Sequence, residues 1–206
     1  IDNWFFIRYA DPEKHIRLRF HLKDVNAIAQ VLTAINQALL IFKENNRISQ
    51  ILVDTYEREL ERYGANIIDE TEQWFGADSD MVLGFINATS KENRDDLRWI
   101  FACKALDILL NDFDCTTQAK YSLMESMRDS FAREFNLDKP MKLLLDAKFR
   151  ENRKVLEQFL VLGSEDEHEY APLLSLIQAR SMDTTSIVKV IVEKQDIAYR
   201  SKYLSD

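Results

Sequence analysis

Residues 4–21 read WFFIRYADPEKHIRLRFH, and this stretch decides the fold of the N-terminal part of the chain. Residues 4–9 are aromatic and β-prone, and residues 10–14, which include Pro12, are typical of a turn. From residue 15 to residue 22 polar and apolar side chains alternate strictly, which predicts a half-buried strand. The two runs together predict a β-hairpin. The sequence leaves its register open; a four-residue loop would place Arg8 beside Arg17.

The alternation gives the second strand a charged side and an apolar side. The charged side carries His15, Arg17, Arg19 and His21, and the apolar side carries Ile16, Leu18, Phe20 and Leu22. Neighbouring arginines repel each other unless an anion offsets their charge, and the planar guanidinium fits a carboxylate or a phosphate bidentately. The charged side is therefore a candidate platform for a carboxylated or phosphorylated ligand. The alternative is an exposed strand face that the many Asp and Glu side chains neutralise.

Two further stretches could carry chemistry. Residues 56–64, YERELERYG, place three carboxylates and two arginines just after a predicted strand, where open sheets usually bind ligands. Their alternative interpretation is a solvated helix face with pairs of opposite charge. Residues 74–80, WFGADSD, form a glycine-containing turn that could orient a ligand, and the alternative is an ordinary helix N-cap at Asp78.

The rest of the chain is predominantly helical in pattern. Apolar residues at three- and four-residue spacing predict a helix from Asp24 to about Asn45, and residues 49–56 predict a third strand. After Gly64 we expect helices at about 66–75, 78–89, 92–113, 117–135, 140–162 and 170–199. The predicted fold is α+β, with a small N-terminal sheet (the hairpin plus a strand after a crossover helix) packed with a larger set of α-helices. Residues 1–206 are expected to form a single domain.

Composition excludes several classes of protein. The chain has 206 residues, a net charge of −8, only four Gly and three Pro, and no apolar run near the length of a membrane span. The net acidity argues against direct nucleic-acid binding. Two cysteines, three histidines without metal-ligand spacing, and the absence of phosphate-loop and nucleophile-elbow motifs predict no disulfide framework, no metal site and no bound cofactor.

The motifs WFFIRYADPEKHIRLRFH, DTYERELERYG and WFGADSD, in this order, resemble a known family. They are similar to the C-terminal domain of class I lantibiotic dehydratases, which also occurs in thiopeptide-type bacteriocin biosynthesis proteins. The resemblance is strong over about residues 3–83 and continues in helical pattern to the end of the chain. It implies a domain that eliminates glutamate from glutamylated Ser and Thr of a ribosomal precursor peptide, giving dehydroalanine or dehydrobutyrine.

The resemblance also implies roles for individual residues. The elimination residues fall on Arg17, Arg19 and Arg62, and Glu59 lies within the same motif. The substrate-binding candidates are Arg8, His15, His21, Tyr56 and Arg58. In β-elimination negative charge grows on the peptide carbonyl and then on the departing carboxylate, and arginines directed at this charge would stabilise the transition state.

One feature of the family is not found in the sequence. The family uses a histidine near its C-terminus, and no matching motif occurs here, so we expect that group to lie beyond Asp206 and the chain to be truncated at both ends. His15 or His21 could supply the proton transfer instead. Two other functions stay open: a cycloaddition that joins two dehydroalanines, as in thiopeptide pyridine synthases, and a non-catalytic domain that binds a peptide or a partner.

The resemblance further implies partners and a location. The expected partners are the glutamylated precursor peptide, a glutamylation domain on the same or another chain, a cyclase and transporter complex, and a second copy of the full protein. The absence of a visible signal peptide and the cysteine usage favour the bacterial cytoplasm, at the periphery of a membrane-bound biosynthetic complex.

Overall fold

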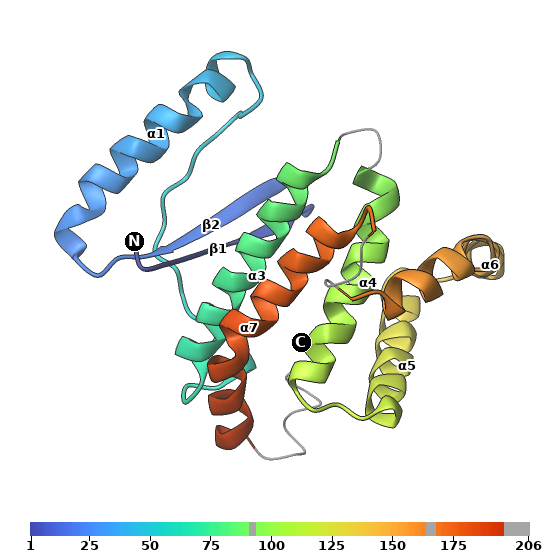
Figure 1. The fold of residues 1–206 in the computed structure, drawn as a ribbon. Coiled ribbons are helices and arrows are strands. Elements are labelled where there is room, and N and C mark those ends of the chain that lie inside the picture. The colour runs from blue at the N-terminus through green and yellow to red at the C-terminus, as the bar shows by residue number, and fades with distance from the viewer. Residues whose placement is uncertain (91–93, 164–167, 196–206) are drawn as a thin grey trace.

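The computed structural model describes residues 1–90, 94–163 and 168–195. It consists of one β-hairpin, one short 3-10 helix and seven α-helices in the described part of the chain (Figure 1). In chain order these are β1 (Asn3–Tyr9), β2 (His15–His21), η1 (Val25–Ala27), α1 (Ile28–Glu44), α2 (Leu60–Tyr63), α3 (Ile68–Ala88), α4 (Arg94–Asp112), α5 (Thr117–Glu134), α6 (Lys139–Val161) and α7 (Ala171–Lys194). The predicted α+β class is confirmed.

The hairpin forms as predicted, but its register differs from the one that a four-residue loop would give. Tyr9 pairs with His15, so the loop has five residues, 10–14. As a result Ile7 lies opposite Arg17 and Arg8 lies opposite Ile16. A shift of one residue moves a side chain to the other face of a sheet, so Arg8 does not lie beside Arg17, the placement that a four-residue loop would have given.

The charged side of β2 faces the same way as the buried side of β1. Phe5 pairs with Arg19, and residues directly opposite in an antiparallel pair share a face. Phe5 is buried, with its ring 5.4 Å from that of Phe75 on α3. The apolar residues Ile16 and Leu18 lie on the other face and are 62% and 41% exposed. The strand is thus only partly covered: Arg19 on its charged side and Phe20 on its apolar side are half-buried, whereas Arg17 and His21 are exposed.

Strand β1 lies directly against helix α3. The backbone N–H of Phe6 donates to the Ser79 hydroxyl (3.2 Å), and the Asn3 side-chain amide donates to the Glu72 carbonyl (2.8 Å). Gly76 makes this approach possible, because a Cβ there would lie 2.2 Å from Asn3 Oδ1 and 3.2 Å from the backbone oxygen of Trp4.

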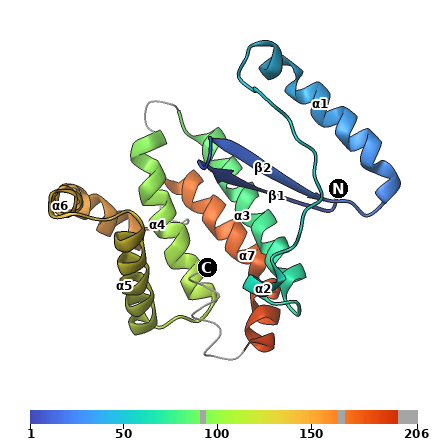
Figure 2. The same cartoon turned by 180° about the vertical axis from the view of Figure 1, so that it is seen from behind.

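The interior lies among α3, α4 and α7, which run side by side, with part of α6 and the Tyr170 region closing one end (Figures 1 and 2). Phe85 and Phe101 stack at 4.5 Å between centroids in the larger apolar cluster. A smaller cluster joins Ile67, Phe113, Val188 and Ile191. These helices form the body on which the hairpin rests.

Most helices were predicted within a few residues. Asp24, Thr116 and Asp138 accept hydrogen bonds from backbone N–H groups two or three residues further on, as expected of N-caps. The predicted break between 75 and 78 is wrong, because α3 continues through Gly76 and its close approach to β1 explains the glycine. The first two residues of the helix predicted from 92, and the end of the one predicted to 199, lie outside the described residues.

The predicted third strand is wrong. Residues 51–59 form an irregular segment without a partner strand, and the sheet of the described residues has two strands. Leu52 and Val53, which favoured the prediction, are 77% and 69% exposed. A β-prone run forms a strand only when it finds an edge to pair with.

Helix α1 stands apart from this body in both views (Figures 1 and 2), and none of its residues is buried. In the described part of the chain, the stretch Val25–Glu44 is long and apolar enough to cross a membrane, with a mean hydropathy of 1.6, contrary to our prediction. A core helix of a soluble protein or a signal sequence meets the same criterion of length and composition, so this property does not assign α1 to a membrane.

Candidate functional site

The centre of the candidate site is Arg19, in the middle of the charged side of β2. Its guanidinium lies over the ring of Tyr56, 4.8 Å from the centroid, and the Tyr56 ring contacts Phe5 edge-on at 5.8 Å. The Nε of Arg19 is buried and has no hydrogen-bond partner among the described residues. The guanidinium therefore gains cation–π attraction from the tyrosine, and it has no ion-pair partner among the described residues.

Arg17 lies nearer the turn of the hairpin and is held in a similar way. Its guanidinium stands 4.1 Å from the centroid of the Tyr9 ring, which stacks on the His15 ring at 5.2 Å. Arg17 Nε donates to His15 Nε2 (3.1 Å), and His15 Nδ1 lies 2.8 Å from the carbonyl oxygen of Glu13. The Glu13 carbonyl oxygen can only accept a hydrogen bond, so His15 Nδ1 carries the proton in this contact. His15 Nε2 is then the acceptor, and its lone pair is occupied by the N–H of Arg17 Nε.

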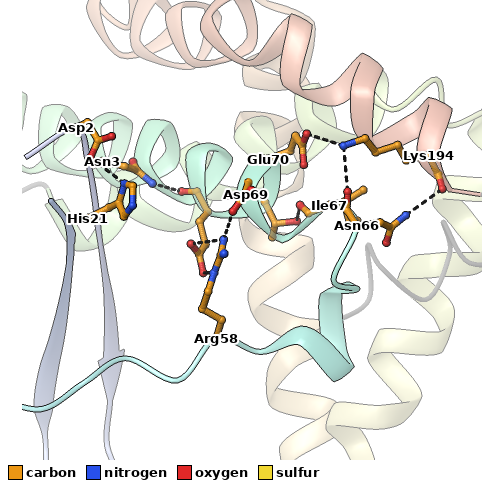
Figure 3. A network of polar contacts seen from close by, with 11 residues as sticks. Asp2, Asn3, His21, Arg58, Asn66, Ile67, Asp69, Glu70 and Lys194 are labelled. Carbon is orange, nitrogen blue, oxygen red and sulfur yellow. Dashed lines mark hydrogen bonds and ion pairs between the residues drawn. The ribbon is translucent and has the colours of Figure 1, made fainter. Parts of the chain in front are cut away.

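Neither Arg17 nor Arg19 pairs with a carboxylate of the described residues, whereas Arg58 is fully engaged. Arg58 donates through Nε and Nη2 to both carboxylate oxygens of Glu72, each at 2.9 Å, and it also pairs with Asp69 (Figure 3). The hydrogen bond to Glu72 is the main cause that raises the pKa of the Arg58 guanidinium. Arg58 therefore has its anionic partners within the protein.

Tyr56 lies between Arg19, which has no carboxylate partner among the described residues, and the ion pair of Arg58 with Glu72. Burial raises its pKa to about 12, and the charges of Glu72 and Glu59 and a hydrogen bond to Glu72 act in the same direction, while Arg19 opposes them. The phenol is thus protonated at neutral pH. Its ring makes the cation–π contact with Arg19, and its hydroxyl is hydrogen-bonded to Glu72, the carboxylate that also binds Arg58.

Glu59 and Arg62 lie at the short helix α2, which follows the irregular segment. Arg62 Nη1 pairs with Glu59 Oε2 at 3.2 Å, and its guanidinium stands 5.2 Å from the Tyr63 ring. Both side chains are more than one-third exposed, so an exposed anion could compete with Glu59 for Arg62.

The structure brings some of the predicted site residues together and separates others. Arg19, Tyr56, Arg58 and Glu59 are connected through ring contacts, hydrogen bonds and charge, and Arg17 and His15 continue the same strand face. His21 ends β2 and pairs with Asp2 at 2.9 Å (Figure 3). Arg8 points to the opposite face of the sheet.

Sequence reasoning missed Glu72 and Asp69, the carboxylates of α3 that hold Arg58. Their position in the first turns of a helix gives no signal for a contact with a residue 11 or 14 positions earlier. Among the described residues, no three His, Cys, Asp or Glu side chains gather as metal ligands would.

The chain is a helix-rich α+β domain whose hairpin carries arginines held by aromatic rings and not paired with carboxylates of the described residues, a side-chain chemistry suited to an anionic group. Comparison with known proteins identifies the family: the model described as "Lantibiotic biosynthesis dehydratase C-term" matches residues 1–203, and the chain belongs to this family.

The chain is also similar to two curated relatives. The subtilin biosynthesis protein SpaB of Bacillus subtilis is 31% identical over 144 residues, which cover 66% of this chain and 14% of that protein. The nisin biosynthesis protein NisB of Lactococcus lactis subsp. lactis is 32% identical over 95 residues, which cover 45% of this chain and 9% of that protein. The chain thus matches only a small part of the length of these relatives, and its family is that of the C-terminal part of lantibiotic biosynthesis dehydratases.

Proposed function

We propose that this domain eliminates glutamate from glutamylated Ser and Thr of a precursor peptide. The observation that supports the proposal is the state of Arg17 and Arg19: their rings and backbone hold them in place, but no carboxylate of the described residues neutralises them. A carboxylated leaving group is the kind of ligand that such arginines accept.

The elimination has two places where negative charge must be stabilised. A base removes the α-proton of the esterified residue, and charge grows on the adjacent peptide carbonyl. The electron pair then forms the Cα–Cβ double bond as the Cβ–O bond breaks, and glutamate departs with the charge on its new carboxylate. Two guanidiniums two residues apart on one strand face can serve both places, because their side chains project in the same direction.

The base is not His15 in the arrangement described, because Arg17 occupies its Nε2, and His21 lies at the far end of the strand with Asp2. The described residues therefore hold the charge-stabilising groups of the proposed reaction.

The proposal is tested by mass spectrometry of a synthetic peptide that carries a glutamyl ester on Ser. The peptide is incubated with this chain and, in parallel, with any longer form of the protein that the gene encodes. Loss of the mass of glutamic acid, abolished by Arg19→Met, would support elimination. An intact ester with every form would contradict it, and conversion of a peptide with two dehydroalanines instead would favour the cycloaddition.

A further inference from the structure

Glu72 connects helix α3 with the start of β1 and with the irregular segment that carries Arg58. It belongs to α3, its side chain is only 15% exposed, and its carboxylate receives two hydrogen bonds from Arg58. Its backbone carbonyl accepts the Asn3 amide at the start of β1 (2.8 Å). A two-oxygen, two-nitrogen contact of this kind fixes direction as well as distance.

The segment that carries Tyr56 has little else to hold it. Residues 51–59 have no ladder of backbone hydrogen bonds, and their apolar side chains 51–53 are exposed. Tyr56 touches Phe5 through its ring, and its hydroxyl is hydrogen-bonded to Glu72. The ion pairs that follow it in the chain are those of Arg58 with α3 and of Glu59 with Arg62. The position of the Tyr56 ring, on which the Arg19 guanidinium lies, therefore depends on two contacts with Glu72: the hydrogen bond of the Tyr56 hydroxyl and the ion pair of Arg58 two residues further on.

We infer that Glu72 is a positioning residue: by holding Arg58 and the Tyr56 hydroxyl it fixes the segment that places the Tyr56 ring under the Arg19 guanidinium. The positioning itself is a statement about this chain. Its catalytic consequence rests on the proposed function, because only there does Arg19 act on the departing glutamate.

The same contact divides the arginines by role. Arg58 uses its donors on Glu72 and Asp69, so it does not compete with Arg19 for the anion of the substrate.

The test compares Glu72→Gln with Glu70→Gln. Glu70 is a matched control, because it lies two residues earlier on α3, is 20% exposed and pairs with Lys194 (2.9 Å), away from Arg58 (Figure 3). The main readout is the NMR signal of the Arg19 Nε–H, assigned by its loss in Arg19→Lys. A proton over an aromatic ring is shifted by the ring current, and Tyr56→Leu gives the position of the signal without that ring.

We expect Glu72→Gln to move the Arg19 signal toward its position in Tyr56→Leu, and to lower the pKa of Tyr56 from about 12, while Glu70→Gln leaves both unchanged. Arg58→Gln removes one of the two contacts between Glu72 and the exposed segment without altering α3, and it must move the Arg19 signal in the same direction if Glu72→Gln fails to fold. An Arg19 signal that stays in its wild-type position in these variants would overturn the inference.

Elimination rates separate this inference from the proposed function. With glutamylated peptide as substrate, Glu72→Gln should lower kcat by about tenfold to a hundredfold with little change in KM, since a misplaced Arg19 loses transition-state contacts. If the NMR signal moves and the elimination rate does not, the positioning by Glu72 stands and the proposed role of Arg19 fails.

Discussion

Two regions of the molecule hold an arginine over an aromatic ring, and they differ in whether a carboxylate of the protein pairs with that arginine. In the interior, the Arg180 guanidinium of α7 stands 5.4 Å from the Trp74 ring and is only 4% exposed. It pairs with Asp78 (2.9 Å) and donates to the backbone carbonyl of Ala105 (2.7 Å). On the hairpin, Arg19 stands 4.8 Å from the Tyr56 ring but has no carboxylate partner in the described part of the chain.

The difference shows how a structural arginine is distinguished from one that binds a ligand. A buried guanidinium needs an anion and acceptors within the protein, because leaving a buried charge unpaired is costly. Arg180 has both, so it joins α3, α4 and α7. Arg19 keeps the supporting ring and lacks the anion, which is the state expected where a ligand supplies the anion instead.

The largest effect is expected at the interior site. Arg180→Met should lower the free energy of unfolding by about 3 kcal/mol, because it leaves Asp78 without its buried partner and opens the contact with the Ala105 carbonyl. Urea unfolding monitored by circular dichroism measures the change. Arg153→Met removes an exposed pair with Glu157 and is the control, with no measurable change expected. Equal stability of both variants would remove the distinction between the two regions.

Arg19→Met should have the opposite pattern. We expect the elimination rate to fall about a hundredfold, the typical cost of losing one donor to developing charge, while the free energy of unfolding changes by less than about 1 kcal/mol. Mass spectrometry of the glutamylated peptide follows the rate, and urea unfolding follows the stability. Lys23→Met removes an exposed charge just after β2 and should leave both unchanged. A variant that is active but poorly folded would place Arg19 with the structural arginines.

The sequence predicts the hairpin and the charged side of β2 well, because strict alternation over eight residues has a single structural meaning. The residue types on that side, His15, Arg17, Arg19 and His21, also indicate an anion. Which arginine is available to a ligand could not be predicted. Arg58 and Arg62 lie in one short motif, yet the partner of Arg58 is Glu72, 14 residues further along the chain.

The wrong predictions have local causes that only tertiary contacts resolve. Gly76 is typical of a break between helices, but in the structure it lies within α3 where β1 approaches too closely for a side chain. Residues 49–56 have the composition of a strand and find no edge to pair with. The face that β2 turns toward the body follows from Phe5, its partner on β1, rather than from the apolar residues of β2 itself.

A smaller effect on the free energy of unfolding is expected at Gly76, where β1 of the hairpin packs against α3. Gly76→Ala should gain about 1 kcal/mol in helix propensity but lose more through the clash with Asn3 and the Trp4 backbone, a net destabilisation of about 1 kcal/mol. Gly84→Ala is the matched change on the same helix, where the added Cβ meets only the flexible end of Leu176. Urea unfolding of the two variants measures the difference. A Gly76→Ala variant more stable than Gly84→Ala would mean that β1 does not rest on α3 as described.

The smallest effect concerns the pH dependence that Tyr56 brings to the hairpin region. Its pKa is raised to about 12 from the ordinary value of 10.0, so the folded state holds the phenolic proton more tightly than the unfolded state does. The contribution to stability is therefore fully present below pH 10 and is lost as the pH rises toward 12. Absorbance at alkaline pH, compared between the wild type and Tyr56→Phe, isolates the titration of this tyrosine, and a midpoint near 10 would contradict the contacts with Glu72 and Glu59. The ring beneath Arg180 is the indole of Trp74, which carries no proton that titrates in this range. Replacement of Trp74 should therefore remove no titrating group from the alkaline absorbance curve.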